Sequence, residues 1–148
     1  MRRALACLVM ALSFSCRVHV LEDGAYAVTV SEVLRDDCAL SSQAMLGRAA
    51  LSTAGDSASI AFSTPEARLE GTYKSGVEEM TLDGNATNFS TLVGGQVCLV
   101  DLVKLHLDTV TVSPEAFRGT MSVTYSTAQH DACVCNYWFA LDAVRVGP

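Results

Sequence analysis

Six cysteines and three histidines carry most of the reactive chemistry in this 148-residue chain. Beyond Cys16 the cysteines number four, and an even number in an exported chain predicts two disulfides. Two of them, Cys133 and Cys135, are two residues apart and would point the same way on a strand, so a bond between them would be strained. We therefore expect Cys38 and Cys98 each to pair with one of them. The alternative is a zinc site of four thiolates, which lacks a C-x-x-C pair.

The histidines predict neither a metal site nor a catalytic centre. None has metal-ligand spacing to another, and His106 alternates with Lys104 and Asp108 on what reads as a polar, solvated strand face. Patterns for nucleotide phosphates or an activated serine are missing, so we predict no catalytic residue, metal or cofactor.

One short motif invites comparison with enzymes. Gly55-Asp56-Ser57 is similar to the G-D-S block of a family of exported esterases, which also needs a late Asp-x-x-His. Here Asp142 is followed by Ala-Val-Arg, and helical repeats for that α/β fold are missing, so we interpret the block as a turn. A small hydrolase stays a minor hypothesis, to be revived by a spatial cluster of Ser, His and Asp.

Two sequons begin at Asn85 and Asn88. They would be glycosylated only in a eukaryotic secretory pathway.

The first residues predict export. Arg2 and Arg3 precede an apolar run, Ala4 to Leu12, that is too short to span a bilayer. The small residues Ser13 and Ser15 lie at −3 and −1 before a cleavage point that precedes Cys16. We therefore assign residues 1–15 to a signal peptide, 16–23 to an N-terminal tether and 24–148 to one domain.

The run that ends at Cys16 resembles the lipobox of bacterial lipoproteins, although Leu12 stands four residues before the cysteine rather than three. The resemblance implies a lipid on Cys16 and a place in the bacterial cell envelope. The alternative is a secreted or periplasmic protein in which Cys16 is an ordinary residue.

The negative net charge limits the classes of partner that we expect. The chain has 10 basic and 16 acidic residues, a net charge of −6, and loss of Arg2 and Arg3 would leave 8 against 16, or −8. No basic cluster is present, which argues against nucleic acid and anionic lipid. We expect contact with a membrane only through the lipid anchor.

Period-two alternation predicts strands throughout the C-terminal third. Apolar residues alternate with polar ones over 117–126 and 103–108, and inward cysteines and aromatics alternate over 133–141. We expect a bulge after Asp108 that turns Val110 and Val112 inward, and a similar shift near Asp142 that turns Val144 and Val146 inward.

Earlier strands are shorter. We expect them at 26–31, 57–63, 68–74, 80–82 and 85–93, with a tight hairpin at Asp83-Gly84 and another turn at Gly94-Gly95. A long connection, 35–56, holds a helical turn at 41–51. About eight antiparallel strands in sequential order favour an all-β up-and-down barrel, which removes the sheet edges. In that topology all four cysteines gather at one rim.

The domain resembles the calycins, the lipocalin-like barrels. It has eight sequential strands, a long first connection, and Gly24-Ala25-Tyr26 where lipocalins carry Gly-x-Trp. It departs from them in the missing tryptophan and in the lack of a C-terminal helix. A two-sheet β-sandwich is the competing fold.

The resemblance implies a cavity, and inward aromatic side chains could line it. A packed interior is the alternative. The candidate lining residues are Tyr26, Phe62, Tyr73, Phe117, Met121, Tyr125, Tyr137 and Phe139. Trp138 has the opposite parity to its neighbours and is expected on the outer face beside Asn136, or inward if the shift falls earlier.

Together these features favour an exported, non-enzymatic protein that binds a small apolar ligand or an envelope protein. A structural or adhesive surface module is the alternative.

The cysteines generate a first prediction. Replacing Cys38 by Ser should destabilise the domain by roughly 2–4 kcal/mol, because the unfolded chain gains the freedom that a disulfide removes. Denaturant unfolding measures the change, and an unaltered midpoint would mean that Cys38 is not disulfide-bonded.

Overall fold

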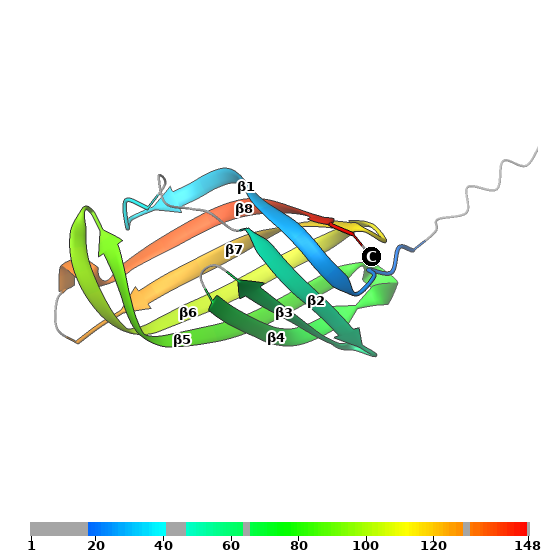
Figure 1. The fold of residues 1–148 in the computed structure, drawn as a ribbon, viewed down its shortest axis with the longest axis horizontal. Helices are drawn as coiled ribbons and strands as arrows, with labels where there is room; N and C mark the ends of the chain where they lie inside the picture. Colours follow the sequence, from blue (N-terminus) through cyan, green and yellow to red (C-terminus); the bar gives the residue numbers. More distant parts are fainter. Residues whose placement is uncertain (1–17, 41–46, 64–65, 129–130, 148) are drawn as a thin grey trace, which may run out of the picture.

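The computed structural model describes residues 18–40, 47–63, 66–128 and 131–147. The predicted signal peptide and Cys16 lie outside these residues. Within them the chain forms a closed antiparallel barrel in which each strand pairs with the next and the last pairs with the first (Figure 1). The fold is the all-β up-and-down barrel that the sequence predicts, and the sandwich is excluded. The strands are β1 (Gly24–Asp36), β2 (Arg48–Ala54), β3 (Ser57–Ser63), β4 (Glu66–Lys74), β5 (Glu79–Val93), β6 (Gln96–Ser113), β7 (Ala116–Ser126) and β8 (Cys135–Arg145).

Two predicted connections are wrong. The predicted helical turn at 41–51 is wrong for the residues from Arg48 onward, because β2 begins at Arg48 and pairs with both β1 and β3. The first part of the predicted turn, residues 41–46, lies outside the described residues. The Asp83-Gly84 hairpin is absent, and β5 runs straight through it. Gly84 instead permits close packing, since a Cβ there would lie 2.5 Å from the Arg68 carbonyl oxygen on β4.

Two predicted parity shifts are also wrong. On β6 the threonines Thr109 and Thr111 are buried, whereas Val110 and Val112 face outward. On β8 the inward alternation continues through Ala143, which leaves Val144 outward and 55% exposed. Strand pairing therefore overrides the apolar pattern at this end of the barrel.

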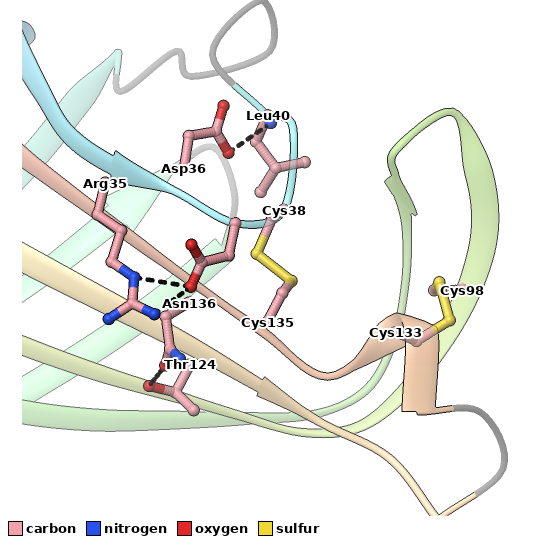
Figure 2. Close-up of a disulfide and its surroundings, with 10 residues drawn as sticks. Arg35, Asp36, Cys38, Leu40, Cys98, Thr124, Cys133, Cys135 and Asn136 are labelled. Carbon is pink, nitrogen blue, oxygen red and sulfur yellow. Dashed lines mark hydrogen bonds and ion pairs between the residues drawn. A yellow bond between two sulfur atoms is a disulfide. The ribbon is translucent and has the colours of Figure 1, made fainter.

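The cysteines gather at the opposite end, as the predicted topology requires (Figure 2). Disulfides join Cys38, just after β1, to Cys135 at the start of β8, and Cys98 on β6 to Cys133. The pairing that the sequence left open is thereby resolved. Cys133 lies in a short 3-10 helix, η2 (Asp131–Cys133), and not on the strand. The tip of the β5–β6 hairpin reaches the same rim, where the Gly94 amide donates to the Cys38 carbonyl at 3.0 Å.

The other end is closed by the segment before β1. Leu21 is 3% exposed, and its amide donates to the Tyr73 hydroxyl at 2.8 Å. The Glu22 amide donates to the Pro114 carbonyl at 2.8 Å. Residues 18–23, which we assigned to a tether, thus lie across the barrel end. None of the helices in the described part of the chain has the length and apolar character to cross a bilayer.

Close strand packing generates a second prediction. A Cβ at Gly71 would lie 2.1 Å from the Thr81 carbonyl oxygen, so Gly71→Ala should destabilise the barrel by about 1–3 kcal/mol. Gly76→Ala is the matched control, because a Cβ at Gly76 would have nothing within 4 Å and the change should stay within about 0.5 kcal/mol. Urea midpoints compare the two, and equal midpoints would contradict the prediction.

Candidate functional site

All eight candidate lining residues point into the barrel. Their exposed fractions run from 0% to 8%, and they belong to one continuous core with the aliphatic side chains. Ring centroids lie 5.3 Å apart for Tyr26 and Phe117, and 5.1 Å apart for Tyr137 and Phe139. Both a packed barrel and a ligand-binding barrel would bury these residues, so a lining role stays a prediction.

The buried tyrosine hydroxyls differ in their partners. That of Tyr26 donates to the Glu22 carbonyl at 2.6 Å, and burial raises the pKa of Tyr26 to about 12. That of Tyr137 is buried without a hydrogen-bond partner among the described residues. Burial also raises the pKa of Tyr137, with nearby Asp36 adding to the effect. An unpaired buried hydroxyl is costly, so Tyr137 is an interior group that a bound polar atom would stabilise.

An open groove of about 670 Å³ lies outside the barrel and is lined by none of these eight residues. It crosses β5, β6, β7 and β8 and reaches Ser31 on β1. Three carboxylates border it, from Glu79, Asp108 and Asp142, together with the guanidinium of Arg118. Among the described residues no salt bridge involves Arg118, Asp142 or Glu79, so these charges are available to a partner.

Next to the groove, strand register builds a row of polar side chains. Asp83 on β5 is opposite His106 on β6, which is opposite Ser122 on β7. The row continues to Trp138 on β8 and Arg35 on β1. We call this row and the groove together the outer polar face.

His106 bridges two carboxylates within this face. Its Nδ1 lies 2.7 Å from an Asp83 oxygen and its Nε2 lies 3.0 Å from an Asp108 oxygen. The Thr81 hydroxyl donates to Asp108 at 2.8 Å. The hydrogen bond to Asp83 is the main cause that raises the pKa of His106, with Asp108 adding to it. His106 lies on the outer face of β6, as the sequence predicts. Its ring is hydrogen-bonded to two carboxylates and is not only solvated.

This geometry does not favour a serine hydrolase. Ser122 is the cross-strand neighbour of His106, so Ser, His and Asp do meet in space. A general base needs a free ring nitrogen toward the serine. Both nitrogens of His106 already face carboxylates. Among the described residues, no group of three or more His, Cys, Asp or Glu side chains is placed to hold a metal ion.

Trp138 supplies the apolar part of the outer polar face. It is 43% exposed, and the Arg35 guanidinium lies 5.9 Å from its ring centroid, within cation–π range. Arg35 is held in turn by Asp37, and Thr124 donates to Asn136 at 2.9 Å beside them (Figure 2). The outward position of Trp138 is the one that its parity predicts.

Sequence reasoning did not find the outer polar face. Alternation alone places His106 and Asp108 on one side of β6, but Asp83 is 23 residues away and joins them only through register. The two sequon asparagines, Asn85 and Asn88, are exposed on β5, as glycan acceptors would have to be.

No protein-family model, curated protein or solved structure matches the chain.

The carboxylate bridge generates a third prediction. Because the pKa of His106 is raised in the folded state, its contribution to stability is complete below the unfolded pKa of about 6.5 and is lost as pH rises through the folded pKa. As the pH rises from about 6.5 through the folded pKa, we expect the melting temperature of the wild type to fall more than that of His106→Gln. An NMR titration of the ring should give a midpoint above 6.5. Identical pH profiles for the two proteins would contradict the bridge.

Proposed function

We propose that this protein is an exported, disulfide-stabilised binding module of non-enzymatic type that recognises an envelope protein through its outer polar face. One observation carries the proposal. The exposed Trp138 lies two residues before Ala140, which lines the open groove, and unpaired charges of both signs border that groove. Tryptophan and arginine dominate the binding energy of protein interfaces. Charges of both signs around them give specificity for a partner with the complementary pattern.

Export and lipidation of Cys16 form part of the proposal. The basic start, the short apolar run and the lipobox-like residues support them. Two disulfides are compatible with an oxidising compartment outside the cytoplasm. The closed eight-stranded barrel is consistent with a lipocalin-like protein, although the groove lies on the outside of the barrel.

A small apolar ligand inside the barrel is the second candidate function. The unpaired hydroxyl of Tyr137 favours it, because a bound molecule with a polar end would give that group a partner. Native mass spectrometry of protein from its own envelope would detect such a molecule as a mass adduct. Absence of an adduct from wild type, with unchanged stability in Tyr137→Phe, would count against this candidate. A structural or adhesive module, the remaining alternative, would require neither an adduct nor a specific partner.

The fourth prediction concerns the outer polar face. A photo-crosslinking residue at position 122, beside Trp138, should trap one defined envelope protein. The purified partner should bind Trp138→Ala at least about tenfold more weakly than wild type, a loss of about 1.4 kcal/mol. Val97→Ala is the matched control, since Val97 is 73% exposed on the β5–β6 hairpin, away from this face.

Two results would contradict the proposal. Equal affinity for wild type and Trp138→Ala would remove the outer polar face as the binding surface. Loss of affinity in Val97→Ala alone would move the interface to the disulfide-bonded rim.

A further inference from the structure

At the barrel end opposite the disulfides, the residues just before β1 contact several other parts of the chain. The His19 amide donates to a carboxylate oxygen of Glu78, and the His19 ring lies 3.0 Å from the same oxygen. Leu21 bonds to Tyr73, and Glu22 bonds to Pro114 and pairs with Arg145. Residues 18–23 therefore contact both the β4–β5 and the β6–β7 connections. We call this segment the strap.

The strap fixes how far an anchor at Cys16 can lie from the barrel. Val18 is the second residue after Cys16, and an extended chain spans at most about 3.6 Å per residue. Their Cα atoms are thus no more than about 7 Å apart. A lipid on Cys16 would insert into a bilayer and bring this barrel end to the headgroup region with it.

The same end exposes aliphatic side chains. Val18 and Val20 on the strap are 51% and 55% exposed, and Val77, next to His19's partner Glu78, is 59% exposed. Val112 is 52% exposed on β6, one residue beyond Thr111, whose amide donates to the Glu78 carbonyl at 2.7 Å. We call these four residues the valine edge.

The polarity of β6 is reversed at this point, which is independent evidence for an apolar contact. Thr109 and Thr111 are 4% and 5% exposed inside the barrel, while Val112 faces outward. A strand end facing only water would be expected to bury its valines and expose its threonines. The hydroxyl of Thr111 has no hydrogen-bond partner among the described residues, so the reversal leaves a buried polar group unpaired.

We propose that the valine edge docks on the bilayer surface beside the lipid on Cys16, so that the barrel stands on the membrane with its disulfide-bonded rim outermost. The inference rests on the proposed lipid anchor and adds a second membrane contact, made by the protein itself. Glu22, Glu78 and Glu115 lie around the same end, so the surface it suits is a zwitterionic one.

Tryptophan fluorescence in vesicles tests this arrangement. The full chain, processed in a bacterial host that lipidates exported proteins, is reconstituted in phosphatidylcholine brominated near the headgroup end of its acyl chains. Trp138→Phe removes the native signal. Val77→Trp then reports on the valine edge, and Val97→Trp, at an exposed valine of the far rim, is the matched control. The intact mass of each variant reports whether Cys16 carries lipid.

We expect a lipidated mass, loss of most of the Val77→Trp fluorescence and an undiminished Val97→Trp signal. A lipidated mass with unquenched Val77→Trp would overturn docking and leave the anchor in place. Equal quenching of both variants would overturn the upright orientation and, with it, the proposal. An unlipidated mass would remove the anchor and docking together.

Discussion

The structure depends on the pairing of its first strand with its last. β1 pairs with β8 from Tyr26 to Asp36, which leaves no open edge in the sheet and lets side chains from all eight strands share one interior. The Cys38–Cys135 disulfide joins the same two strands covalently at one end. The strap, whose own Leu21 is buried, closes the other end. The outer polar face also depends on this pairing, because its row of side chains crosses from Trp138 on β8 to Arg35 on β1.

Alternation along single strands predicted the fold class, the order of strands and the rim where the cysteines meet. The predicted number of strands was right only because two errors cancelled. β2 was missed, since its buried Ala49 and its exposed Ala50 give almost no contrast in polarity. β5 was divided at Asp83-Gly84, where the glycine serves close contact with β4 and not a turn. The Asp-Gly sequence alone does not show whether the glycine allows a tight turn or a close contact with a neighbouring strand.

The candidate site shows a second limit of sequence reasoning. His106 and Asp108 could be placed on one face from β6 alone, but Asp83 and Trp138 joined them only through the register of three further strands. At Val110 and Val112 the apolar pattern predicted the wrong face. Local rules are expected to fail where a residue serves a contact other than the core, and the membrane contact that we propose for the valine edge would be such a case at Val112.

The pairing of β1 with β8 also favours an order in which the strands assemble. β1 is the first strand to be synthesised, but its principal partner is the last strand of the barrel, and the Cys38–Cys135 bond spans 97 residues. The meander from β5 to β8 is made of sequence neighbours, and its own bond, Cys98–Cys133, spans only 35. Loop-closure entropy favours the shorter connections first. If Cys16 carries a lipid as proposed, the anchored N-terminus would hold β1 at the membrane until β8 emerges. The pairing of β1 with β8 would then close the barrel at the membrane surface.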